Sequence, residues 1–118
     1  MGYESKLFIV EESDFKIPSD NGKVYARVVG SIDLCKCYPI TEVFVDNANG
    51  YIYADDGNTR IDEDMYGNPF GVATLDEVIE KLKEIVKDSD YHRAKVALGF
   101  LKAVQKDMPH CVVYHFGY

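Results

Sequence analysis

Cysteine and histidine residues suggest a metal centre as the first chemistry to consider. On a strand the two thiols of Cys35-Lys-Cys37 would point to the same side, and a last strand lying alongside would bring further ligands. The candidate ligands are Cys35, Cys37, Cys111, His110 and His115. Structural zinc sites use two spaced ligand pairs, whereas this sequence has one Cys-x-Cys, so reduced, buried or half-buried thiols are the favoured interpretation. A catalytic cysteine would need a neighbouring base that the sequence does not place.

Carboxylates concentrate in the middle of the chain and suggest either a cation or a protein partner. Aligning Gly67 with the turn glycine of an EF-hand loop puts Tyr66 and Ala73 at ligand positions, so we expect no dedicated metal site. Two alternatives remain: a solvated loop, or an acidic recognition surface whose tyrosine rings add contact area. The candidate partner-binding residues are Tyr51, Tyr53, Asp55, Asp56, Asp62, Glu63, Asp64 and Tyr66.

Motifs for other catalytic chemistry are missing from the sequence. It contains no Gly-x-Ser-x-Gly, no phosphate loop, no His-Glu-x-x-His and no dinucleotide fingerprint, and it has only three histidines. We therefore expect no cofactor and rank an enzyme, such as a small hydrolase using carboxylates or a thiol, behind the binding functions.

Composition and charge limit the class of protein and its partners. With 118 residues, 47% of them hydrophobic, the chain is predicted to form one domain over residues 1–118. The net charge is −7, and residues 51–73 carry five acidic residues and one basic residue, so we expect no direct nucleic-acid binding. No apolar run approaches the length of about 20 residues that spans a membrane. Three cysteines cannot all pair within one molecule, which favours a cytoplasmic location.

Two amphipathic helices are the firmest structural prediction. Thr74-Leu-Asp-Glu77 matches a capping box, and apolar residues follow at helical spacing to residue 88. A second helix is predicted over residues 89–108, ended by Pro109. Because its apolar residues cover more than half of its circumference, including Val96 and Phe100, we expect it to be the more deeply buried of the two.

The remaining elements are predicted strands. Apolar and alternating segments predict strands over residues 6–11, 24–35, 42–46, 51–54 and 110–116, with a bend or bulge at Gly30. Asn49-Gly50 predicts a hairpin of the third and fourth strands, and residues 67–71 close the loop after it. The fold class is α+β: a mostly antiparallel sheet of about four to five strands, with two consecutive helices packed on one face. A free sheet edge also suggests a homodimer.

Three short segments, residues 1–7, 51–59 and 112–118, resemble small phage and prophage proteins without an assigned activity. The resemblance implies an accessory protein in a bacterial cytoplasm that binds a host factor or imitates the charge of DNA. The preferred hypothesis is thus a non-enzymatic binding protein, an acidic inhibitor of a basic or nucleic-acid-binding host (defence) protein. The alternatives are a protein that binds or sequesters a small ligand such as a nucleotide and, last, a small hydrolase.

Overall fold

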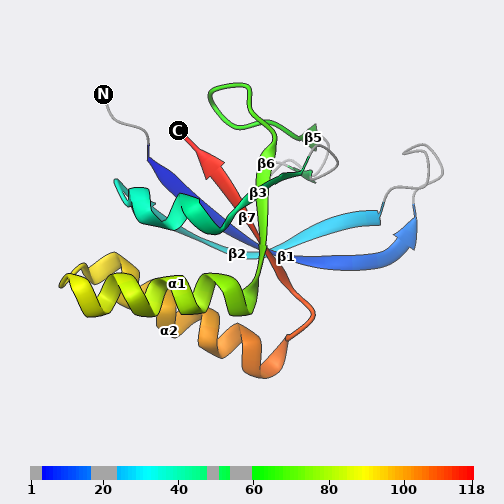
Figure 1. Ribbon diagram of the computed structural model, residues 1–118. Coiled ribbons are helices and arrows are strands. Elements are labelled where there is room, and N and C mark those ends of the chain that lie inside the picture. Colours follow the sequence, from blue (N-terminus) through cyan, green and yellow to red (C-terminus); the bar gives the residue numbers. More distant parts are fainter. Residues whose placement is uncertain (1–3, 17–23, 48–50, 54–59) are drawn as a thin grey trace.

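Five strands form one antiparallel sheet, which is the framework of the fold (Figure 1). The computed structural model describes residues 4–16, 24–47, 51–53 and 60–118. The strands stand in the order β2-β1-β7-β6-β3, and every neighbouring pair is antiparallel. Their bounds are Ser5–Lys16 (β1), Val24–Cys35 (β2), Val45–Asn47 (β3), Phe70–Thr74 (β6) and Val112–Gly117 (β7). The predicted α+β fold with a mostly antiparallel sheet of four to five strands is confirmed.

Strands β1 and β2 form a long hairpin that the sequence predicts only in part. A first strand is predicted over residues 6–11, but β1 continues to Lys16 and pairs with β2. Val28 and Gly30 pair with consecutive residues of β1, so Val29 is the extra residue of a β-bulge. The irregularity predicted at Gly30 is therefore present, one residue earlier in the strand.

The predicted hairpin between residues 42–46 and 51–54 is wrong. The chain first forms a 3-10 helix, η2 (Tyr38–Val43), with a proline in its first turn, and β3 then pairs with β6. The strand β4 (Ile52–Tyr53) pairs instead with β5 (Arg60–Ile61) in a separate two-stranded sheet. The sequence also misses β6, because a strand of five residues with a glycine at its second position gives little periodic signal. The predicted turn at Asn49-Gly50 lies outside the described residues.

Both predicted helices are present and lie on the same side of the sheet (Figure 1). Helix α1 spans Leu75–Asp88 and begins as predicted at Thr74, whose hydroxyl accepts a hydrogen bond from the backbone N–H of Glu77. Helix α2 spans His92–Asp107, slightly shorter than predicted because the backbone N–H of Ser89 still caps α1. No helix among the described residues is long and apolar enough to cross a membrane.

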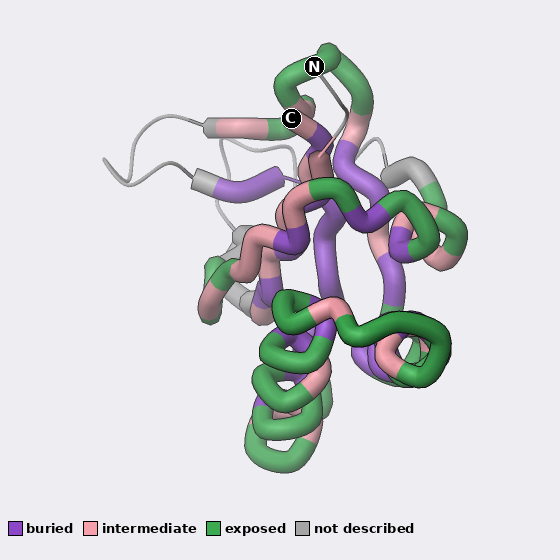
Figure 2. The backbone as a smooth tube through the Cα atoms, turned by 90° about the vertical axis from the view of Figure 1, so that its left-hand side faces the viewer, coloured by how far each residue is buried: buried purple, intermediate pink, exposed green. Residues whose placement is uncertain are grey.

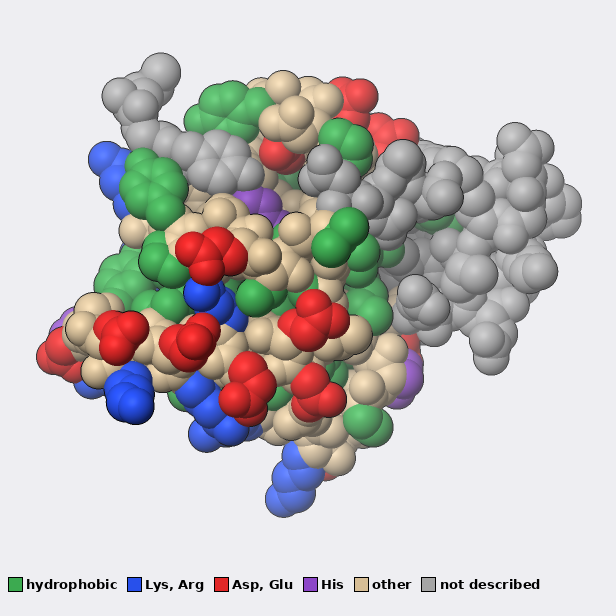
Figure 3. Space-filling model, in the orientation of Figure 1, with side chains coloured by type: hydrophobic (Ala, Val, Ile, Leu, Met, Phe, Trp, Pro, Cys, Tyr) green, Lys and Arg blue, Asp and Glu red, His purple; other side chains and the backbone are tan. Residues whose placement is uncertain are grey.

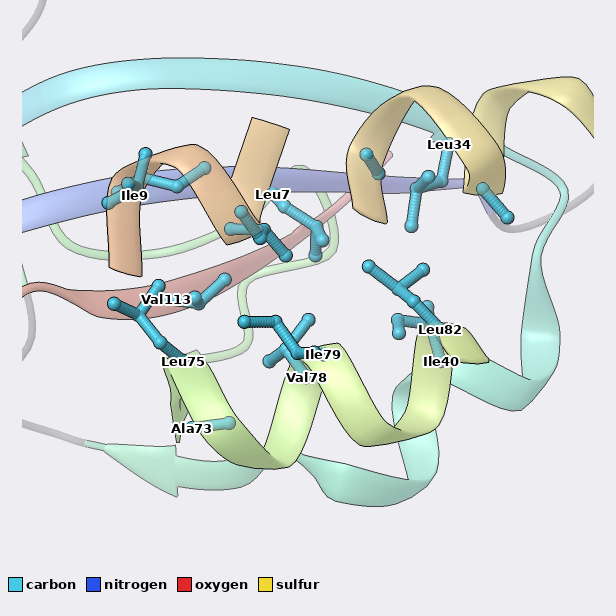
Figure 4. Close-up of a cluster of buried hydrophobic side chains, with 14 of the residues drawn as sticks. Leu7, Ile9, Leu34, Ile40, Ala73, Leu75, Val78, Ile79, Leu82 and Val113 are labelled. Carbon is cyan, nitrogen blue, oxygen red and sulfur yellow. The ribbon is translucent and has the colours of Figure 1, made fainter. Parts of the chain in front are cut away.

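The main core lies between the sheet and the helices (Figures 2 and 4). Leu7 and Leu34 from the sheet meet Leu82 of α1 and Leu101 of α2, and all four are fully buried. A second cluster covers the other face of the sheet, where β4 packs; its buried members are Val10, Ile52, Phe70 and Tyr114. The sheet is thus covered on both faces at its centre.

Helix α2 is not the more deeply buried helix, contrary to the prediction. It buries four residues over 16, whereas α1 buries five over 14. Small side chains, Ala94 and Ala97, form part of its core face, while Val96 is 63% exposed. Phe100 lies over Gly30 of β2 and stays 36% exposed. The broad apolar surface of α2 therefore extends past the core onto the outside of the molecule.

Candidate functional site

Of the eight predicted partner-binding residues, four lie in one loop and Tyr51 lies in the interior. Tyr51 is only 2% exposed and packs inside the protein, so it cannot serve as an exposed contact. Tyr53 lies in β4, and Asp55 and Asp56 lie outside the described residues. The other four occupy the loop between β5 and β6: Asp62, Glu63, Asp64 and Tyr66. We call residues 62–68 the Asp64 loop.

The Asp64 loop is held in one conformation by its own aspartate. The Oδ1 atom of Asp64 accepts hydrogen bonds from the backbone N–H of Tyr66 at 2.8 Å and of Asn68 at 3.0 Å. The Asp64 backbone N–H donates to the carbonyl of Asn68, and the N–H of Gly67 donates back to the carbonyl of Asp64. Gly67 adopts a φ of +78°, which favours glycine. The sequence Asp-x-x-Gly-Asn therefore builds a closed turn.

A backbone contact fixes this turn to the sheet, and the side chains at its tip face solvent. The N–H of Met65 donates to the carbonyl of Gly117 at the end of β7. Met65 is 72% exposed and Tyr66 is 54% exposed, and Asp62 and Glu63 are exposed beside them. Tyr66 is one of the predicted contact residues, whereas Met65 is not, because the sequence argument depends on carboxylates and tyrosines. The exposed methionine is the unexpected feature of this loop.

A polar pocket of about 290 Å³ adjoins the loop, between η2 and strand β7. Thr41 of η2, Asp64 and Asn68 supply its polar side chains, and the ring of Phe44 forms one wall. The complete lining is Thr41, Phe44, Asp64, Asn68, Pro69, Gly71 and His115. Because Asp64 belongs both to this lining and to the loop, pocket and loop form one continuous site.

His115 is the buried ionisable group of the pocket. It is 6% exposed, and its Nε2 atom lies 2.8 Å from the Oγ atom of Ser5, which is 1% exposed. The ring of Phe44 packs at 5.2 Å between centroids. Burial lowers the pKa of His115, and the Asp64 carboxylate opposes part of that shift. The imidazole is therefore neutral at neutral pH.

The Ser5–His115 pair invites comparison with a nucleophile and its base, but the geometry does not support catalysis. Ser5 is buried and does not line the pocket, so its hydroxyl has no path to a substrate. Its contact instead orients the imidazole. The sequence could not reveal this pair, because its members lie 110 residues apart and meet through the pairing of β1 with β7.

The cysteines and histidines considered for zinc do not converge. Among the described residues, no three His, Cys, Asp or Glu side chains lie close enough together to hold a metal ion. Cys37 and Cys111 are buried in the main core, where burial raises the pKa of both thiols. His110 contacts Glu11 at 2.8 Å on the surface, away from the pocket lining. Buried thiols with a raised pKa are poor nucleophiles.

Comparison with known proteins gives this chain no relative: neither a family, nor a curated protein, nor a solved structure matches it.

Proposed function

We propose that this protein is a non-enzymatic binding protein that recognises a basic partner protein through the Asp64 loop. The observation that carries the proposal is the exposure of Met65 and Tyr66 side by side at the tip of a braced turn, with Asp62 and Glu63 next to them. Methionine and tyrosine are enriched in the centres of protein interfaces, and charged groups belong to their rims. The Asp64 loop has the same composition, with Met65 and Tyr66 as the centre and Asp62 and Glu63 as the charged rim.

The bracing of the loop favours binding. A turn that is already held by hydrogen bonds from Asp64 and by the contact between Met65 and Gly117 loses little backbone freedom when a partner docks. The carboxylates would then speed the encounter with a basic surface and select against acidic ones.

The acidic residues on and beside α1 are paired with lysines, which argues against a long negative surface that imitates DNA. On α1, Lys83 pairs with Glu80 at 3.1 Å, and Lys81 pairs with Glu42 at 2.6 Å and with Glu84 at 3.5 Å. Lysines thus lie between the carboxylates on this side of the molecule (Figure 3). An unbroken row of negative charge is what a DNA mimic would require. We place the partner contact on the Asp64 loop for this reason.

The resemblance of three segments to phage and prophage proteins supplies a setting for the proposal. In that setting the protein acts in a bacterial cytoplasm and inhibits a basic or nucleic-acid-binding host protein, for example one used in defence. The partner would present a cationic surface, because the loop offers carboxylates around an apolar centre.

Affinity capture with paired variants tests this proposal. Wild-type protein is immobilised and exposed to bacterial lysate, in parallel with Met65→Ser/Tyr66→Ser and with Asp62→Asn/Glu63→Gln. Both loop variants should lose the captured protein, and capture by the wild type should weaken as salt rises. Asp64 is left unchanged because it braces the turn.

Matched controls separate the loop from general effects of charge and hydrophobicity. Glu80→Gln/Asp88→Asn removes two charges from α1, and Val96→Ser removes an exposed apolar side chain from α2. Both controls should capture the partner as the wild type does. If the loop variants and the controls capture the same protein equally well, the Asp64 loop is not the binding site.

A further inference from the structure

The pocket beside the Asp64 loop has properties that select one kind of side chain. We infer that it receives the guanidinium group of an arginine presented by the bound partner, an inference that rests on the proposed function and specifies the partner. Its lining includes a carboxylate residue, Asp64, a hydroxyl residue, Thr41, and an amide residue, Asn68, around a space of about 290 Å³.

Size and charge exclude the larger and the anionic ligands. Pockets for drug-sized ligands hold about 300–1,000 Å³, so this one lies at the lower limit and suits a single side chain better than a whole nucleotide. Its lining contains the carboxylate of Asp64 and neither lysine nor arginine, so a phosphate would meet only negative charge. Burial disfavours the charged form of His115, so this ring does not supply the pocket with a cation at neutral pH.

The arrangement of the lining favours arginine over lysine. A guanidinium group is flat and carries five N–H donors, which need several acceptors around one plane. Here Oδ1 of Asp64 already accepts the two hydrogen bonds of the turn, so Oδ2 is its acceptor for a ligand. The Thr41 hydroxyl, which donates to the carbonyl of Tyr38, can still accept, and Asn68 adds an amide oxygen to the lining. Phe44 also lines the pocket, and an aromatic ring attracts a flat cation more favourably than an aliphatic wall does. A lysine ammonium group would use fewer of these contacts.

The position of Asp64 links the pocket to the partner surface. Asp64 lines the pocket, and the two residues that follow it directly are the exposed Met65 and Tyr66. A partner whose apolar surface rests on these two side chains therefore has its neighbouring residues within reach of the pocket. The basic partner required by the acidic loop is also the kind of protein that supplies arginine.

Small blocked amino acids test the pocket without any knowledge of the partner. N-acetyl-arginine methylamide is titrated into isotopically labelled protein, and the backbone amide signals of Asn68, Gly71 and His115 are followed by NMR. We expect saturable shifts at these positions. The citrulline analogue has the same shape without the charge and should bind at least tenfold more weakly, and the lysine analogue should lie between them. Absence of saturable shifts with arginine, or equal binding of citrulline, would overturn the inference.

One substitution removes the charge while it preserves the turn. In Asp64→Asn the amide oxygen can still accept the hydrogen bonds from Tyr66 and Asn68, so the loop keeps its shape. This variant should bind the arginine probe at least tenfold more weakly. Asp88→Asn makes the same change in charge at the exposed end of α1, outside the pocket lining, and should bind the probe as the wild type does.

The partner itself separates this inference from the proposed function. Capture of the partner should fall in Asp64→Asn and, to a smaller extent, in Asp62→Asn. If capture depends on Met65 and Tyr66 but is unaffected by Asp64→Asn, the binding protein stands and the arginine pocket is refuted. If the probe binds but no loop variant alters capture, the pocket does not serve a partner held by this loop, and the inference fails in that form.

Discussion

Gly71 offers the sharpest test of how the pocket is built. It lies in β6 opposite His115, and a Cβ atom at this position would lie 2.7 Å from Cβ of Phe44 and 3.5 Å from Cβ of His115. Ordinary carbon–carbon contacts are about 3.5–4.0 Å, so the methyl carbon added in Gly71→Ala would lie roughly 1 Å too close to Cβ of Phe44. Because Cβ of Phe44 is attached directly to the backbone, the chain itself must move. We expect a loss of about 1–3 kcal/mol in the free energy of unfolding, typical of overpacking.

Gly30→Ala is the matched comparison. Its Cβ would lie 2.8 Å from Cζ of Phe100, nearly the same overlap. Phe100, however, meets this position with the far end of a ring that is 36% exposed, and the ring can rotate outwards. The backbone of Gly30 does not have a positive φ, so alanine can adopt it. We expect the free energy of unfolding to stay within about 1 kcal/mol of the wild type. Alanine lowers the conformational entropy of the unfolded chain, and this gain offsets part of the cost of moving the ring.

Urea unfolding followed by far-ultraviolet circular dichroism measures both changes, since the protein lacks tryptophan. Gly71→Ala should unfold at a clearly lower urea concentration than Gly30→Ala, with unchanged slopes. Equal stabilities, or a larger loss for Gly30→Ala, would refute the argument that rigid and flexible neighbours respond differently to the same added methyl group.

Three further predictions concern the core, the first helix and the pocket. Leu82→Ala removes a fully buried side chain and should cost about 2–5 kcal/mol in urea unfolding. Thr74→Ala should cost about 1 kcal/mol, while Thr74→Ser, which keeps the cap to Glu77, should stay near the wild type. The lowered pKa of His115 means that the unfolded chain binds a proton more readily than the folded protein, so stability should fall as pH drops through the ordinary value of 6.5. His115→Gln should reduce this pH dependence between pH 8 and 5.5, and an unchanged slope would contradict it.

Local signals account for what the sequence could predict. The capping box at Thr74 and the helical spacing after it depend on residues within one or two turns, so α1 was predicted with its true start. The hairpin predicted between residues 42–46 and 51–54 is wrong because the sequence does not show which strand each segment pairs with. β3 has three residues and β4 has two, too few for a period of two to decide which strand each one joins.

The candidate site was predictable in its charge but not in its shape. Asp62 and Glu63 are exposed as the acidic composition suggests, but Tyr51 is buried, because composition does not reveal which ring faces the core. The pocket was not predictable at all. Its lining comes from η2, the Asp64 loop, β6 and β7, and only the tertiary fold brings these distant segments together.

The central position of strand β7 in the sheet affects the order in which the sheet assembles during synthesis. It follows every other strand along the chain, yet it lies between β1 and β6 at the centre of the sheet. Until it emerges from the ribosome, the β1–β2 hairpin and the β3–β6 pair are separate halves with open edges, which are exposed to misassembly. β7 also carries His115 and the carbonyl of Gly117 that holds the Asp64 loop. This sheet is therefore joined, and the Asp64 loop fixed to it, only after β7 has been made.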